Sequence, residues 1–375
     1  MKQYYILFSG IIFLLLSCQQ QKGFEVIFDL KNATDCSVYV SQAIPNPQVW
    51  YTDTFELKNG KAVFKGEVEY PRLVCFTFKN GEEDFYGSCG VFLDNSRIKV
   101  SGDFKKLGKM SDLNNVNIEG GKKHQEYVDI LKNGDAIFKK YGKLSYRQSQ
   151  AFKSNRTLYD SLAPFVKEAY RDVFEYITTL PGYATSQVAP YFVKKYFNTS
   201  DMDKLEKALN GFDASLATNP YVAACRQELE NEKKVMPGTK AYDFTLQDLD
   251  GKTYRLSDFR GKYVLLEFSA SWCGWCKLEI PFLQKVYQNT KGKDFVMFTV
   301  NLDDNRDKWE QDVREHNLPW PVISDLQAFK SPVAKNYNVS GIPAIFLIAP
   351  DGIIEDKGLR REKLVEYINH LFKNK

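Results

Sequence analysis

A pair of cysteines stands in the stretch Ser271-Trp272-Cys273-Gly274-Trp275-Cys276, which decides the fold of the C-terminal part of this chain. An apolar run at 263–268 precedes the pair and a helical pattern follows it, so both cysteines are predicted to lie where a strand turns into a helix. A helix N-terminus carries partial positive charge and unpaired backbone N–H groups, which stabilise a thiolate. Cys273 is therefore the expected nucleophile. Cys276, one turn further on, is the expected resolving thiol that closes a disulfide with it.

Three other uses of such a pair have weaker support. Structural zinc needs four ligands, but the sequence has no second Cys-x-x-Cys pair and its three histidines stand at unrelated spacings, so we expect no metal site. Haem attachment requires a histidine directly after the second cysteine, where this chain has Lys277. Two inert buried thiols are a further alternative. The neighbouring tryptophans and the helix-entry position favour instead a reactive, partly exposed pair.

Four separated features of residues 237–375 resemble the TlpA/ResA-like thiol-disulfide oxidoreductases, which have a thioredoxin fold. One is the cysteine motif itself, and another is Pro281, at the position of a proline that kinks the family's first long helix. A third is Gly341-Ile342-Pro343, which resembles a loop whose cis-proline faces the disulfide. The fourth is the segment that leads into the motif, with Asp243-Phe244-Thr245-Leu246, Asp250-Gly251-Lys252 and Leu256-Ser257-Asp258-Phe259-Arg260-Gly261-Lys262.

The resemblance also implies a surface for substrates. Beside a cis-proline at Pro343, Ile342 is expected to offer its backbone N–H and C=O groups to an extended substrate segment. Trp272 and Trp275 flank the cysteines, and we assign them to substrate binding as well. Two further tryptophans, Trp309 and Trp320, are candidates for an aromatic rim around the site, although ordinary core packing is the favoured interpretation for both.

Two glutamates are candidates for proton transfer. Glu267, in the apolar strand before the motif, matches the buried acid beneath the disulfide of thioredoxin, and Glu279 matches a glutamate of ResA-like proteins. Burial is expected to raise the pKa of Glu267 from about 4.3 toward neutral, so that it can take the proton of Cys276 as that thiol resolves a mixed disulfide. The alternative for each glutamate is a structural ion pair with a lysine such as Lys262 or Lys293.

Upstream, residues 24–118 are predicted to form a small β-rich module, either a sandwich or a barrel. Apart from Ile27, apolar residues alternate with polar ones from Phe24 to Leu30, which is typical of a half-buried strand. Lys58-Asn59-Gly60-Lys61 and Lys79-Asn80-Gly81 are hairpin-turn signals. This module resembles the N-terminal β modules of uncharacterised function that precede thioredoxin domains in envelope lipoproteins.

Residues 121–235 have helical apolar spacing, with breaks at Leu180-Pro181-Gly182 and Asn219-Pro220. They carry no group of residues typical of a chemical site, and we expect them to act as a spacer. The predicted fold is therefore an α/β thioredoxin fold over residues 237–375, preceded by a small mostly-β domain and a helical linker region.

Residues 1–17 have the pattern of a lipoprotein signal peptide. A basic start precedes an apolar stretch of 13 residues, Tyr4 to Leu16, which is too short to span a membrane. Leu15-Leu16-Ser17-Cys18 resembles a lipobox, which implies cleavage before Cys18 and lipid on its sulfur and amine. Because Gln19 stands where an inner-membrane retention signal would have aspartate, we expect an outer-membrane anchor in the cell envelope, facing the periplasm. A plain secretory signal is the alternative.

Composition limits the remaining possibilities. The 51 basic and 47 acidic residues give a net charge of +4 without a basic run, which argues against nucleic-acid binding. Of the other cysteines, Cys75 and Cys89 fall in two candidate strands and could form a structural disulfide. We favour buried free thiols for both.

Together these features predict a lipid-anchored thiol-disulfide oxidoreductase that exchanges disulfides of periplasmic proteins, with no cofactor other than the disulfide between Cys273 and Cys276. The resemblance favours reduction, with a membrane thiol-reducing transporter as electron donor. Two alternatives stay open. A thioredoxin-fold peroxidase would normally have its cysteine in a Pro-x-x-x-Thr-x-x-Cys setting, which this chain lacks. An envelope binding protein would use its β and helical modules to recognise a glycan or protein, with the thioredoxin domain secondary.

Overall fold

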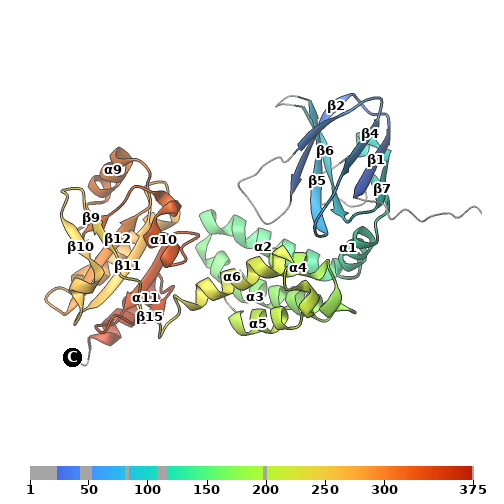
Figure 1. Cartoon of the computed structure of the whole chain (residues 1–375). Coiled ribbons are helices and arrows are strands. Elements are labelled where there is room, and N and C mark those ends of the chain that lie inside the picture. The colour runs from blue at the N-terminus through green and yellow to red at the C-terminus, as the bar shows by residue number, and fades with distance from the viewer. Residues whose placement is uncertain (1–22, 43–52, 81–83, 108–115, 197–200, 374–375) are drawn as a thin grey trace, which may run out of the picture. The chain divides into compact units, whose positions relative to one another are not determined.

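The computed structural model describes residues 23–42, 53–80, 84–107, 116–196 and 201–373 (Figure 1). The chain divides into two compact units, residues 1–225 and 226–375. Cys18 and residues 1–17, for which we expect a signal peptide, lie outside the described residues. No helix in the described ranges is both long enough and apolar enough to cross a membrane.

The described residues of the first unit begin with two four-stranded sheets, in the orders β4-β1-β7-β8 and β3-β2-β5-β6. Phe28 of β1 packs edge-on against Phe76 of β5, with ring centroids 5.1 Å apart, so the two sheets share one core. Burial alternates along β1, as predicted from its sequence. The strands are β1 Phe24–Lys31, β2 Cys36–Gln42, β3 Asp53–Leu57, β4 Lys61–Gly66, β5 Arg72–Asn80, β6 Asp84–Leu93, β7 Arg97–Asp103 and β8 Val116–Gly120.

The turn at Asn59-Gly60 forms as the sequence predicts but connects two sheets. Lys58 and Lys61 exchange both backbone hydrogen bonds across it, and both central residues have positive φ, 48° at Asn59 and 73° at Gly60. Beyond the turn the strands diverge, because β3 pairs with β2 whereas β4 pairs with β1. The other predicted turn continues into residues 81–83, which lie outside the described residues, although β5 and β6 pair antiparallel around it.

Cys75 and Cys89 are both buried and form no disulfide, as we favoured. The strand register gives the reason. Cys75 lies opposite Gly90, whereas Cys89 lies opposite Phe76, so the two thiols stand on opposite faces of the sheet.

Helices follow the sheets, as expected, and the first of them packs directly on the β module. Tyr127 of α1 stacks on Phe92 of β6, and the buried ring of His124 accepts the Phe92 backbone N–H at Nδ1. This burial lowers the pKa of His124 to about 4, so the ring is neutral at pH 7. The helices are α1 Lys122–Asn133, α2 Asp135–Ser154, α3 Arg156–Thr178, α4 Ala189–Lys195, α5 Met202–Asn210 and α6 Pro220–Lys233.

The second unit contains a five-stranded sheet in the order β13-β12-β11-β14-β15. Strand β11 is central, parallel to β12 and antiparallel to β14, and it is buried on both faces. Leu266 and Phe268 face one core cluster and Leu265 faces the other, so helices cover both sides as in a thioredoxin fold. The elements are β9 Thr245–Gln247, β10 Thr253–Arg255, β11 Tyr263–Ser269, α7 Gly274–Lys277, α8 Ile280–Asn289, β12 Phe295–Asn301, α9 Arg306–His316, β13 Val322–Ile323, α10 Pro332–Asn336, β14 Ala344–Ile348, β15 Ile354–Lys357 and α11 Arg361–Leu371.

The helical pattern after the cysteines forms two consecutive helices. Helix α7 ends at Lys277, and α8 starts at Ile280 with Pro281 in its first turn. Proline lacks a backbone N–H, and a helix does not need that group in its first turn. The backbone stays right-handed at Leu278 and Glu279, so the helical path is interrupted just before Pro281, where a kink was expected.

Candidate active site

Cys273 and Cys276 form a disulfide at the start of α7, with their Cα atoms 5.3 Å apart. Cys273 is the N-cap residue of this helix, and its Sγ accepts the backbone N–H of Cys276 at 3.0 Å. This places the Cys273 sulfur at the end of the helix where unpaired N–H groups stabilise negative charge. Exposure does not separate the two residues, because Cys273 is 4% exposed and Cys276 is 2% exposed in the disulfide form. The expected partly exposed pair is thus wrong for this form.

Asp303, which the sequence analysis missed, fixes the loop before the cysteines. Its carboxylate is buried and accepts the backbone N–H of Ser271 at 3.0 Å, the Ser271 hydroxyl at 2.7 Å and the amide of Asn301 at 2.8 Å. Asp303 comes just after β12, which runs parallel to β11, so the carboxyl ends of both strands meet at one edge of the sheet. The position of Asp303 just after an apolar strand is the signal in the sequence that could have identified it.

Glu267 lies in the middle of β11, between Thr299 of β12 and Ile345 of β14. Its Oε2 accepts the Thr299 hydroxyl at 2.8 Å, and Thr299 in turn accepts the indole N–H of Trp320 at 2.9 Å. Within the described part of the chain, Oε1 has no hydrogen-bond partner. Burial is the main cause that raises the pKa of Glu267 to about 8, and the Thr299 hydrogen bond opposes it. The direction of this change agrees with the expectation.

Glu279 stands in a different environment, between α7 and α8. Its side chain is 3% exposed and pairs with two arginines, Arg360 at 3.3 Å and Arg361 at 3.4 Å. The backbone N–H of Arg361 donates a third contact to Oε2 at 3.0 Å. The structural ion pair that we weighed for Glu279 is therefore present, although its cations are arginines and not lysines.

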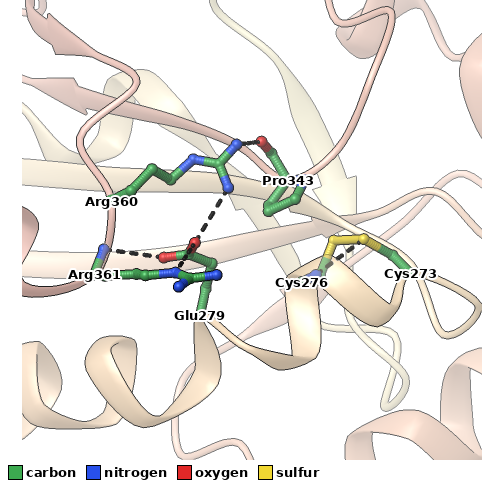
Figure 2. A network of polar contacts seen from close by, with 6 residues as sticks. All are labelled: Cys273, Cys276, Glu279, Pro343, Arg360 and Arg361. Carbon is green, nitrogen blue, oxygen red and sulfur yellow. Dashed lines mark hydrogen bonds and ion pairs between the residues drawn. A yellow bond between two sulfur atoms is a disulfide. The ribbon is translucent and has the colours of Figure 1, made fainter. Parts of the chain in front are cut away.

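The Ile342–Pro343 peptide bond is cis, as the resemblance implied. Ile342 and Ala344, on either side of the proline, pack against the same core cluster that contains both cysteines. Figure 2 shows Arg360 between this loop and Glu279, with its Nη2 donating to the Pro343 carbonyl oxygen and its Nη1 donating to Glu279.

The tryptophans divide into two groups. Trp272 is 59% exposed and Trp275 is 40% exposed, and Trp272 lies against Phe329 with ring centroids 6.1 Å apart. Trp309 and Trp320 are buried, so the packing interpretation is correct for both and the aromatic rim is wrong for them. Trp320 has a more specific place than packing alone, because it holds the hydroxyl that contacts Glu267.

In the described residues, no group of three or more His, Cys, Asp or Glu side chains is arranged to hold a metal ion. The groups that the arrangement offers for chemistry are two sulfurs, a buried acid of raised pKa, and a backbone edge beside a cis-proline.

Two family models match the chain. One, described as the AhpC/TSA family, matches residues 237–357, and the other, a Domain of unknown function (DUF4369), matches residues 24–127. The second extends beyond the β module into α1, in keeping with the packing of that helix on β6.

Curated relatives match part of the chain. The thiol-disulfide oxidoreductase ResA of Bacillus thuringiensis is 34% identical over 143 residues, which is 37% of this chain and 81% of the relative. ResA of Geobacillus kaustophilus is 35% identical over 121 residues, covering 32% of this chain and 68% of that protein. Among solved structures, the thioredoxin domain of a thiol-disulfide oxidoreductase from Bacteroides vulgatus is 32% identical with a TM-score of 0.35, covering 36% of this chain and 96% of that one.

Proposed function

Because this chain belongs to the ResA-like family of thiol-disulfide oxidoreductases, we propose that it reduces disulfides of periplasmic proteins from a lipid anchor in the cell envelope. The observation that carries the proposal is the Cys273–Cys276 disulfide at the start of α7, in a domain whose docking loop holds a cis-proline at Pro343. The pair is its own redox group, and the mechanism uses no other cofactor.

The reaction proceeds by two thiol-disulfide exchanges. In the reduced enzyme the Cys273 thiolate attacks one sulfur of the substrate disulfide, and the other substrate sulfur leaves as a thiolate. Cys276 then loses its proton and attacks the Cys273 sulfur, which releases the second substrate thiolate and closes the enzyme disulfide. Two electrons pass from the two enzyme thiols to the substrate, whose thiolates take protons from solvent.

Glu267 is the group that we assign to the proton of Cys276. A carboxyl group whose pKa is about 8 exchanges protons readily near neutral pH, which suits a general base for a thiol. Glu279 is a poorer candidate, because its carboxylate is already held by two arginines. In this proposal Glu279 supports the site and Glu267 moves the proton.

Substrates dock beside the disulfide. Ile342 offers backbone groups next to Pro343, in the way that an added strand pairs with a sheet edge. The exposed rings of Trp272 and Trp275 provide apolar area next to Cys273 for side chains of the substrate. A protein segment in extended conformation fits these features better than a folded surface does.

The cellular setting follows from the N-terminal sequence. A lipobox ending at Cys18, with Gln19 after it, supports an outer-membrane anchor that faces the periplasm. Electrons to regenerate the thiols would then come from a membrane thiol-reducing transporter, and the absence of a basic run speaks against nucleic acid as a partner. Mass spectrometry of the mature N-terminus tests the anchor: diacylglycerol on Cys18 is expected, and an unmodified N-terminus would exclude it.

Insulin reduction by dithiothreitol tests the activity. The wild-type protein should accelerate it, Cys273→Ser should abolish the acceleration, and Cys276→Ser should accumulate a mixed disulfide with the substrate. Cys75→Ser is the matched control, since that thiol is buried in the other unit and should leave the rate unchanged. Wild-type activity in Cys273→Ser would overturn the proposal, and a wild-type protein that does not accelerate insulin reduction would favour a binding protein.

A comparison of two substrates distinguishes a thiol-disulfide oxidoreductase from a peroxidase. If Cys273 reacts mainly with peroxide, hydrogen peroxide should be consumed with dithiothreitol as reductant much faster than insulin is reduced. The disulfide between two cysteines one turn apart favours the exchange reaction, because the resolving thiol is already next to the attacking one.

A further inference from the structure

Arg360 joins the two parts of the proposed site that the chain brings in from distant segments. It is the N-cap residue of α11, and its side chain is 39% exposed. Its guanidinium group donates through Nη2 to the carbonyl oxygen of Pro343 and through Nη1 to the Glu279 carboxylate (Figure 2). Glu279 stands three residues after Cys276, so one side chain connects the substrate-docking loop to the segment that carries the redox pair.

Glu279 is held in place without Arg360. Its Oε2 accepts the Arg361 backbone N–H at 3.0 Å and its Oε1 accepts Nε of the Arg361 side chain at 3.4 Å. Separating a buried carboxylate from its cations leaves an uncompensated buried charge, which is strongly unfavourable. The Glu279 side chain is therefore held in a fixed position. Arg360 therefore extends from a fixed point to the Pro343 carbonyl.

The Pro343 carbonyl has special importance for the loop. Pairing of β14 with β11 begins at Ala344, and proline has no backbone N–H. The Pro343 carbonyl oxygen therefore has no partner in the pairing of β14 with β11. A charge-assisted hydrogen bond from a guanidinium group is stronger than one between neutral groups and fixes direction. By fixing the peptide plane that contains this carbonyl, Arg360 also limits how the backbone of Ile342 can rotate.

We propose that Arg360 is a positioning residue for protein substrates, which holds the docking loop in the orientation that Ile342 needs to pair with an extended segment. This inference rests on the proposed function and adds to it the residue that organises docking. A pre-ordered loop binds more tightly because less conformational freedom is lost when substrate docks. The effect on docking is therefore expected as weaker binding of large substrates.

The chain offers a matched pair of variants, since Arg360 and Arg361 both pair with Glu279 but only Arg360 contacts Pro343. Each is replaced by methionine in the full chain, and steady-state kinetics are measured with insulin and with the small disulfide 5,5′-dithiobis(2-nitrobenzoate), which needs no docked peptide. For Arg360→Met we expect KM for insulin to rise about tenfold, as for loss of one charge-assisted hydrogen bond. Because the Arg360 charge also lowers the pKa of Glu267, any change in kcat should be the same for insulin and for the small disulfide, whereas the rise in KM should be confined to insulin.

Arg361→Met should keep KM for insulin within about twofold. An equal rise of KM in both variants would overturn the inference, because loss of positive charge around Glu279 would then explain the rise. An unchanged KM in Arg360→Met would also overturn it. If Arg360→Met does not fold, Arg360→Lys serves in its place. A smaller rise in KM is then expected, and an unchanged KM would overturn the inference. A wild-type protein that reduces neither substrate would refute the proposed function itself, which keeps the two failures separate.

Discussion

Replacement of Glu267 by glutamine removes the buried acid at the centre of the proposed mechanism while keeping its shape. The glutamine Oε1 can still accept the Thr299 hydroxyl that now donates to Glu267 at 2.8 Å. What the variant loses is the ability to ionise. The pH dependence of the free energy of unfolding should therefore differ between the wild type and this variant in one defined window.

The size and sign of the difference follow from the raised pKa. The unfolded chain releases the Glu267 proton near its ordinary pKa of 4.5, whereas the folded protein holds it until about pH 8. Between these values the unfolded state binds fewer protons than the folded state, so the free energy of unfolding falls as pH rises, and it levels off above pH 8. At about 1.4 kcal/mol per pH unit, this corresponds to about 5 kcal/mol over the window.

Tryptophan fluorescence during guanidinium denaturation measures this effect in the second unit, because four of the five tryptophans lie within residues 237–375. Both oxidised proteins would be unfolded at intervals from pH 4.5 to 9. Other titrating groups affect both proteins alike, so the difference in free energy of unfolding isolates Glu267. We expect Glu267→Gln to gain about 5 kcal/mol relative to wild type between pH 4.5 and 8.

Parallel curves for the two proteins over this range would refute the reasoning, since they would show that Glu267 ionises in the folded protein as it does in the unfolded chain. Stopped-flow kinetics give the functional counterpart. Above pH 8, where Glu267 is ionised in wild type, the variant should resolve mixed disulfides more slowly by about 10². An unchanged rate there would show that Glu267 does not take the proton.

Two further predictions concern neighbours of this acid. In the reduced protein near neutral pH, Cys273 should be alkylated by iodoacetamide well before Cys276, because its sulfur lies at the helix N-terminus; peptide mapping by mass spectrometry measures this, and equal rates would contradict the assignment. Thr299→Val should raise the pKa of Glu267 above about 8 by removing the one hydrogen bond that lowers it, whereas Thr299→Ser keeps the hydroxyl and serves as control; the same unfolding series detects the change as a window that extends to higher pH.

Local patterns in the sequence were sufficient to predict the redox centre and its scaffold. The apolar run at 263–268 and the cysteine spacing place Cys273 at a strand-to-helix turn, and the structure has that turn at the end of β11. Alternation from Phe24 to Leu30 likewise predicts a strand with one buried face. These features depend on neighbours within a few residues, where the period of side-chain directions is fixed by backbone geometry.

The cis-proline and the two carboxylates came from resemblance, and the structure then gave them different surroundings. Glu267 and Glu279 are both buried glutamates near one motif, and the local sequence places Glu267 in an apolar strand without naming the partner of either residue. Their partners do: a hydroxyl 32 residues away for Glu267, and arginines 81 and 82 residues away for Glu279.

The sequence alone determined the elements, their faces and the chemistry of the cysteine pair, because each is specified by local spacing. Tertiary structure alone decided that Asn59-Gly60 leads from one sheet to another, that Trp320 holds the hydroxyl beside Glu267, and that Arg360 links Glu279 to Pro343. Such contacts join segments whose approach depends on every intervening turn and on the pairing of distant strands. A polar partner that lies one helix or one strand away in space leaves no periodic signal in the sequence around either residue.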